Sequence, residues 1–295
     1  MTDCIKAKRT SRFRKWSLQQ KIMLSITTVI FSLYSLTLIY PFVYTFINSL
    51  KDEMSLFNEP FALPKTLEWS NYSLALELKI RKTGLAGMFF NSLWQTATSS
   101  IVGLLASAVT AYVCARFDFK FLKVIYAIGV TVMVIPIVGN TAAMYKLLYS
   151  TGIADKPFLI WVIWAGPFGF AYMVLYSFFK TVSRTYSEAA MIDGAGHLRV
   201  FVQIVMPQAL PAVSSMVIIS AIGAWNDYMT PYLYLPSYPN IAVGLYELSS
   251  STRWASGGTP VFYALMLISL VPIIVIFIAF QKIILSNVSI GGLKG

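Results

Sequence analysis

The sequence is poor in charge, in histidine and in cysteine. Charged residues make up 12% of the 295 residues and hydrophobic residues 57%, whereas soluble domains contain roughly a quarter charged residues. The two cysteines, Cys4 and Cys114, are too far apart to indicate a disulfide framework or a zinc motif. The chain also lacks a G-x-x-x-x-G-K-[ST] phosphate loop and an H-E-x-x-H motif. We therefore expect a membrane protein that is not an enzyme and holds no metal.

Apolar runs near or above roughly twenty residues, the length that crosses a bilayer, occur six times along the chain. They are Ile22 to Asn48, Met88 to Ala115, Leu122 to Met144, Phe158 to Phe179, Ala209 to Leu235 and Val261 to Leu285. No contiguous stretch remains for a separate soluble core. We expect an all-α integral membrane protein with six transmembrane helices, whose membrane domain covers residues 22–285 between tails at 1–21 and 286–295.

The formal net charge of +11 is explained by topology. If residues 1–21 are cytoplasmic, fifteen of the 23 Lys and Arg residues lie on the cytoplasmic side and eight lie outside. Because the distribution of Lys and Arg sets orientation, we expect both termini in the cytoplasm and the protein in the bacterial inner membrane. The lipid bilayer is then its solvent, and the charge requires no nucleic-acid partner.

Small side chains recur at every fourth position of the second run: Ser99, Gly103, Ser107, Ala111 and Ala115. On a helix these residues form one stripe, and such stripes let the backbones of neighbouring membrane helices approach closely. The sequence leaves open whether this seam is static or slides.

The cytoplasmic segment 183–211, between the fourth and fifth runs, is organised unlike a simple loop. Thr185 followed by Glu188 fits a capping box that opens a short helix, and the glycines at Gly194–Gly196 interrupt it. A second amphipathic helix follows, with an apolar stripe that ends at two prolines: Leu198, Phe201, Val202, Val205, Pro207 and Pro211. An exposed stripe of this kind docks into a groove of another protein or lies on the membrane surface, and physics alone does not choose between the two.

This segment closely resembles the EAA motif of ABC importer permeases, E-A-A-x-x-x-G followed by a spaced I-x-x-P. The matching residues are Glu188, Ala189, Ala190, Asp193, Gly194, Ala195, Ile204, Pro207 and Pro211. The resemblance implies a coupling helix seated in a cleft of a partner ATPase, with Glu188 pairing with a basic group there and Gly194 shaping the turn. It makes Phe201 and Pro207 coupling residues as well. On physical grounds alone, Glu188 also suits a helix start and Gly194 also suits a turn.

Three further segments resemble the maltose-permease branch, the carbohydrate uptake type 1 importers: Ala111 to Phe119, Gly223 to Leu235 and Gly291 to Gly295. This resemblance implies a permease subunit of an ATP-driven, binding-protein-dependent importer of a sugar, expected to be an oligosaccharide. It implies an ABC ATPase dimer that uses ATP and Mg, a second and paralogous permease, and an extracytoplasmic solute-binding protein. This chain itself is expected to bind no cofactor. In the family the carboxy-terminal tail can also reach the ATPase, which makes Gly291, Gly292 and Lys294 candidates for that contact.

Polar and aromatic residues at the end of the fifth run are candidates for the substrate pathway. Sugar sites combine flat apolar rings with hydrogen-bonding groups, and polar residues inside a membrane are functional candidates by default. Candidates of this kind are Trp225, Asn226, Asp227 and Tyr228, with Asn91 in the second run as a weaker one. Trp and Tyr also anchor helices at the membrane boundary, so site and anchor both remain open.

Two alternatives to a sugar permease remain. One is an ABC permease for a non-sugar solute, and the other is a non-transporting membrane scaffold or sensor, which would leave the EAA spacing unexplained. For a sugar permease, neutral and uronate-containing oligosaccharides are both compatible with the sequence.

Overall fold

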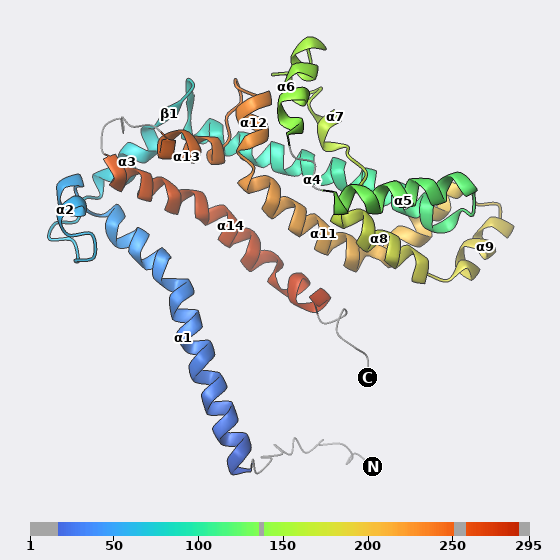
Figure 1. The fold of residues 1–295 in the computed structure, drawn as a ribbon, viewed down its shortest axis with the longest axis horizontal. Helices are drawn as coiled ribbons and strands as arrows, with labels where there is room; N and C mark the ends of the chain where they lie inside the picture. Colours follow the sequence, from blue (N-terminus) through green and yellow to red (C-terminus); the bar gives the residue numbers. More distant parts are fainter. Residues whose placement is uncertain (1–16, 136–138, 251–257, 289–295) are drawn as a thin grey trace, which may run out of the picture.

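The computed structural model describes residues 17–135, 139–250 and 258–288, and most of them are helical (Figure 1). The elements in chain order are α1 (Leu18–Ser49), α2 (Glu53–Asn58), α3 (Ser70–Glu77), β1 (Lys79–Ile80), β2 (Thr83–Gly84), α4 (Leu85–Arg116), α5 (Lys120–Val134), α6 (Asn140–Ser150), α7 (Trp161–Trp164), α8 (Phe170–Thr181), α9 (Arg184–Ile192), α10 (His197–Val200), the π-helical turn η1 (Phe201–Val205), α11 (Met206–Asn226), α12 (Met229–Tyr234), α13 (Ile241–Ser250) and α14 (Gly258–Val288).

Four helices of the described chain are long and apolar enough to cross a membrane: Leu18–Ser49, Leu85–Arg116, His197–Asn226 and Gly258–Gln281. The third and fourth predicted spans are each divided instead. α5 and α6 share the third, and α7 and α8 share the fourth, with a non-helical stretch from Ala165 to Gly169 between them. The all-helical membrane fold is thus confirmed, while the count of six spans stays a prediction.

The core lies around α4, which packs along α8 and α11. Ser107, Ala111 and Ala115 of the small-residue stripe are buried there, and a Cβ at Gly103 would come within 3.1 Å of the Trp164 carbonyl oxygen. The stripe therefore does let neighbouring backbones approach, as such stripes do in membranes. At the end of α4 that carries Arg116, aromatic rings of three helices meet: Tyr112, Phe179 and Phe201.

The helix that begins at His197 runs through both prolines to Asn226. Our expectation that Pro207 and Pro211 end the cytoplasmic helix is therefore wrong. The π-helical turn η1 lies just before Pro207, and the side-chain amide of Gln208 donates to the carbonyl of Ile204 at 2.8 Å. A proline removes one backbone donor from a helix. Here the wider turn η1 precedes the proline, and the Gln208 side chain supplies a donor to the Ile204 carbonyl, so the helix stays continuous.

The loop after α1 is folded onto the end of that helix through a buried lysine and a buried asparagine. Lys51 is 2% exposed, and its Nζ donates to the carbonyls of Glu59 and Pro60 at 2.8 and 3.3 Å. Burial lowers the pKa of Lys51, and the nearby Glu59 carboxylate opposes that shift. Asn71 of α3 donates to the carbonyls of Ser49 and Lys51 at 2.9 and 2.8 Å. Buried backbone carbonyls need such partners, so these side chains fix the loop.

The β1–β2 hairpin is held by an arginine at its tip. Arg81 and Lys82 both have positive φ, the conformation required of a two-residue hairpin turn. Arg81 Nε lies 2.6 Å from Glu247 Oε1 of α13, and its guanidinium stacks 4.7 Å from the ring centroid of Tyr232 in α12. The hairpin is thereby fastened to two helices at the end of α4 remote from Arg116.

Helix α1 diverges from the rest of the bundle (Figure 1). It contacts α14, with the rings of Tyr44 and Tyr263 6.2 Å apart, but no residue of its apolar window is buried. The apolar surface of α1 is therefore exposed along the helix and is free to contact lipid or another chain.

Candidate functional site

The EAA residues lie on α9, at the opposite end of α4 from the β1–β2 hairpin. The cap of α9 is Ser183, whose Oγ accepts from the backbone N–H of Thr185 at 3.2 Å. The predicted capping box of Thr185 and Glu188 is therefore wrong, because the cap lies two residues earlier, at Ser183. Serine and threonine are both good caps, and sequence spacing alone did not distinguish them. Because the helix starts earlier, Glu188 lies past the first turn and its side chain is exposed.

Gly194 ends α9 in the left-handed conformation, with φ of +84°. Its N–H donates to the Met191 carbonyl at 3.0 Å, and the Ala195 N–H donates to the Ala190 carbonyl at 2.9 Å. These bonds satisfy helix-end carbonyls that would otherwise lack partners. A Cβ at Gly194 would meet nothing within 4 Å, so the glycine is needed for its backbone conformation and not for space.

The segment divides into an exposed face and a buried face. Ile192 is 87% exposed and Leu198 75% exposed, and Tyr186 lies exposed beside them. Phe201, by contrast, is 9% exposed and packs on Tyr112 with 4.6 Å between ring centroids. Our prediction of one exposed stripe that includes Phe201 is wrong, because half of that stripe is the protein's own core.

Of the other predicted coupling residues, Ala189, Asp193 and Pro207 are exposed, while Ala190 and Ala195 are half-buried. Ala190 and Ala195 pack against the core around α4. Glu188 and Ala189 are thus exposed, while Ala190 and Ala195 pack against the same buried cluster as Phe201.

A cavity of about 200 Å³ lies between α9 and the end of α4. It is lined by Tyr112, Arg116, Phe117, Arg184, Ser187, Glu188, Met191 and His197. The guanidinium of Arg184 reaches across to Asp118 Oδ2 at 3.2 and 3.3 Å, and the imidazole of His197 contacts the ring of Phe117, with 5.3 Å between centroids. The start of α9 and the start of α10 are thus both attached to the end of α4.

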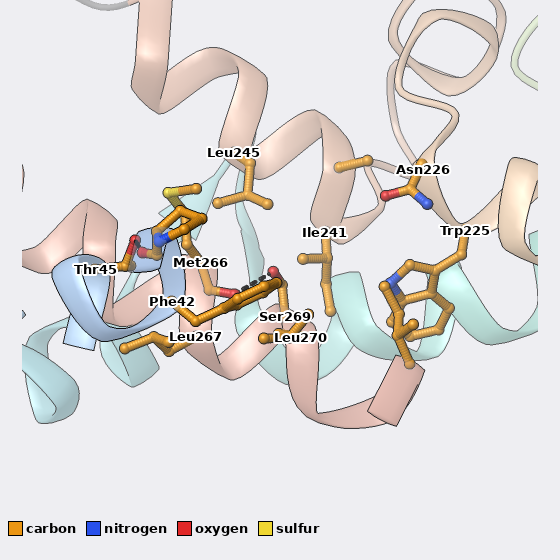
Figure 2. Close-up of a pocket in the computed structure, with 13 residues that line it drawn as sticks. Phe42, Thr45, Trp225, Asn226, Ile241, Leu245, Met266, Leu267, Ser269 and Leu270 are labelled. Atoms are coloured by element: carbon orange, nitrogen blue, oxygen red, sulfur yellow. Dashed lines mark hydrogen bonds between the residues drawn. The ribbon is translucent and has the colours of Figure 1, made fainter. Parts of the chain in front are cut away.

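A second candidate region is the membrane pocket shown in Figure 2, with a volume of about 310 Å³. Its lining comes from α1, α11, α13 and α14, and it is apolar except for Thr45, Asn226 and Ser269. Trp225 is buried at its edge and packs edge-to-face on Phe89, 6.1 Å between centroids. The same indole also lines an apolar cavity of about 240 Å³ on its other side. Two of the predicted pathway residues, Trp225 and Asn226, therefore do line a pocket.

The other three predicted pathway residues do not line this pocket. Asp227 Oδ1 accepts from the backbone N–H of Thr230 at 3.1 Å, and the ring of Tyr228 stacks on that of Tyr246 at 4.5 Å. Asn91 donates to the Pro239 carbonyl at 2.9 Å. Each of these side chains joins parts of the fold. Gly291, Gly292 and Lys294 lie outside the described residues.

Sequence reasoning missed a polar ladder that runs from α4 to the start of α13. Gln95 donates to the Tyr238 carbonyl at 2.9 Å, and Ser92 Oγ accepts from the Ile241 N–H at 3.0 Å. Asn240 of this stretch donates to the Asp227 carbonyl at 2.9 Å. The spacing of Asn91 and Gln95, one helical turn apart, was the signal that could have revealed it.

The sequence profile of the binding-protein-dependent transport system inner membrane component family matches residues 103–290, well over half of the chain. The chain belongs to this family of ABC importer permeases. Such permeases are integral proteins of the inner membrane, work with an ATPase and a binding protein, and are not themselves enzymes.

Two curated relatives are similar over most of their length. The chain is 27% identical to the diacetylchitobiose uptake system permease protein NgcG of Streptomyces coelicolor, over 90% of this chain and 88% of that protein. It is 25% identical to the melibiose/raffinose/stachyose import permease protein MelC of Bacillus subtilis, over 92% of this chain and 96% of that protein. A crystal structure of a bacterial ABC transporter involved in the import of the acidic polysaccharide alginate has the same fold, with a TM-score of 0.76, 21% identity and coverage of 90% and 98% of the two chains.

The left-handed turn predicts different effects of alanine at two neighbouring glycines. Gly194→Ala should raise the exchange rate of the Gly194 and Ala195 amides roughly fivefold, because an L-residue with positive φ costs about 1 kcal/mol. Gly196→Ala is the matched control, since Gly196 has φ of −73° and open space at its Cβ. Hydrogen exchange of peptides that cover α9 and α10 measures both. Equal exchange in the two variants would show that the turn does not depend on glycine.

Proposed function

We propose that this chain is the permease subunit of an importer that carries a sugar of oligosaccharide size into the cytoplasm. The observation that carries the proposal is the folded EAA segment, with Glu188 exposed on α9 and Gly194 closing the helix in the left-handed conformation. Support for a sugar comes from the relatives whose names specify oligosaccharides. It also comes from a pocket whose walls are two aromatic rings, Trp225 and Phe42, and other apolar side chains with three interspersed polar groups, the composition typical of small-molecule sites.

The coupling end and the pocket are joined by a single long helix, which suggests how ATPase movement reaches the substrate. The helix from His197 to Asn226 has 30 residues and is therefore about 45 Å long. It begins next to α9 and ends at the pocket that Asn226 lines. In the proposed mechanism, ATP and Mg act at the partner ATPase dimer, which moves α9. The long helix carries that movement to the pocket, as alternating access requires.

A second permease subunit is proposed to cover α1. A 32-residue helix whose apolar window has no buried residue leaves an unusually long apolar surface. We propose a paralogous permease as its neighbour, with both termini in the cytoplasm, where the excess of Lys and Arg would lie.

Uptake measurements test the transport proposal directly. Cells that lack this chain should fail to take up one labelled oligosaccharide from a panel of neutral and uronate-containing oligosaccharides, and the wild-type gene should restore its entry. Glu188→Lys should insert into the membrane but not restore uptake, because the reversed charge repels the basic group expected on the ATPase.

The matched control is Glu77→Lys, the same reversal at an exposed glutamate at the end of α3, which should restore uptake fully. Unchanged entry of every oligosaccharide in the deletion strain would refute the sugar proposal and favour another solute.

The membrane pocket is proposed to lie on the sugar pathway, and Asn226 provides its test. Asn226→Ala should raise the KM of uptake roughly fivefold with little change in Vmax, since a lost hydrogen bond costs about 1 kcal/mol of binding. Asn58→Ala removes an exposed amide from α2 and should leave KM unchanged. If both variants have the wild-type KM, the sugar does not contact this amide.

Photo-crosslinking tests the second subunit. A photoreactive amino acid at Leu36, which is 62% exposed on α1, should crosslink to a permease chain of different sequence in intact membranes. The same group at Phe57 of α2, exposed but outside the apolar helix, serves as the control and should give no such product. Crosslinks from Leu36 to lipid alone would indicate that α1 faces the bilayer.

A further inference from the structure

The last residue of α4 has a buried guanidinium edge without a partner. Arg116 Nε and Nη2 are inaccessible to solvent and make no hydrogen bond to any residue that the structure describes. Two adjacent N–H groups of a guanidinium form the fork that binds one carboxylate through two parallel bonds. Arg116 as a whole is half-buried, and a charge that is partly removed from water in this way is less favourable when it is unpaired. The environment of Arg116 therefore calls for an oxyanion.

A carboxylate without a partner lies on the same cavity. Glu188 lines the space of about 200 Å³ that Arg116 also lines, and within the described ranges it forms no ion pair. It is the only acidic residue in that lining. The nearby Asp118 already binds Arg184. One cation and one anion thus line the same cavity without an ion pair between them.

A third group in the cavity fits the same anion. Ser187, adjacent to Glu188 on α9, has a buried Oγ without a hydrogen-bond partner among the residues described. A hydroxyl can donate to a carboxylate, so Ser187 would supply a further donor beside the guanidinium fork. The cavity would then hold a carboxylate by charge and by hydrogen bonds together.

We propose that Arg116 is the intramolecular partner of Glu188 and a positioning residue for coupling. When no ATPase group holds Glu188, its carboxylate turns into the cavity and bonds to Arg116; when the ATPase docks, the carboxylate turns outward to it. Because both partners compete for one carboxylate, Arg116 sets how readily α9 engages the ATPase. The inference rests on the proposed coupling role of α9 and adds a residue of α4 to it.

The pairing is tested by a double-mutant cycle in the complete transporter, reconstituted in lipid nanodiscs without nucleotide and read by hydrogen exchange of α9 peptides. Arg116→Gln and Glu188→Gln should each raise α9 exchange at least threefold, because each removes the same bond between α9 and α4. The double variant should exchange no faster than either single one. With a non-hydrolysable ATP analogue that keeps the ATPase docked, the effect of Arg116→Gln should disappear.

Arg199→Gln is the matched control, because Arg199 is an exposed arginine of α10 that bonds Gln203 and does not line the cavity. Its effect on α9 should be small and should add to that of Glu188→Gln. If Arg116→Gln does not insert into the membrane, Arg116→Lys replaces it in the cycle. Lysine keeps the positive charge but lacks the two parallel N–H donors. Its effect on α9 exchange should be smaller and should also vanish in the Glu188→Gln background.

Additive effects of Arg116→Gln and Glu188→Gln would overturn the proposal. A second result would also overturn it: inorganic phosphate slows α9 exchange in the wild type and in Glu188→Gln, but not in Arg116→Gln. The cavity would then be a site for a free oxyanion. Both results are independent of sugar uptake. A transporter that imports its sugar but shows additive effects would retain the proposed function and lose this inference, whereas a deletion strain with normal uptake would refute the function first.

Discussion

The close approach of α8 and α11 to α4 is the constraint on which the rest of the structure depends. Moving an apolar side chain from lipid into the protein interior changes its free energy little, because both environments are apolar. Helices in a membrane therefore associate through dense packing and hydrogen bonds. Ala111 and Ala115 supply the packing, because their small side chains bring the core aromatic rings against the α4 backbone. Asn91 and Gln95 supply hydrogen bonds near the other end of the same helix. α4 thereby holds together the end of the fold that carries α9 and the end that carries the start of α13.

Two long helices, α4 and the helix from His197 to Asn226, pack on each other between the α9 end of the fold and its opposite end, and they differ in regularity. α4 is regular throughout its 32 residues. The helix from His197 to Asn226 contains a π-helical turn and two prolines near its coupling end. π-helical turns and prolines are both common causes of helix kinks, and π-helical turns are frequent at functional sites. Phe201 lies within that turn and packs on Tyr112 of the regular helix α4.

The sequence predicted what depends on composition and spacing, and it failed where tertiary contacts decide. The apolar windows, the small-residue stripe and the glycine turn at Gly194 could all be found, because each follows from the local chain. The burial of Phe201 could not be predicted. Helical spacing shows that an apolar face exists, but it does not tell whether the protein's own core or a partner covers that face. Ser183 and Thr185 are equally suitable as caps of α9, so the sequence does not choose between them. The helix continues through Pro207 because of the π-helical turn η1, which the sequence does not reveal.

The same reasoning explains why only part of the predicted pathway set lines a pocket. Between α11 and α13 parts of the chain are not helical, and their backbone carbonyls have no intrahelical donors. Side chains replace them: Asn240 bonds the carbonyl of Asp227, and Asn91 bonds that of Pro239. Asn226 differs, because it bonds within its own helix, to Ile222, and lines the pocket. The polar side chains of this region thus fall into two groups: those that bond the backbone of another segment, and Asn226, which lines the pocket.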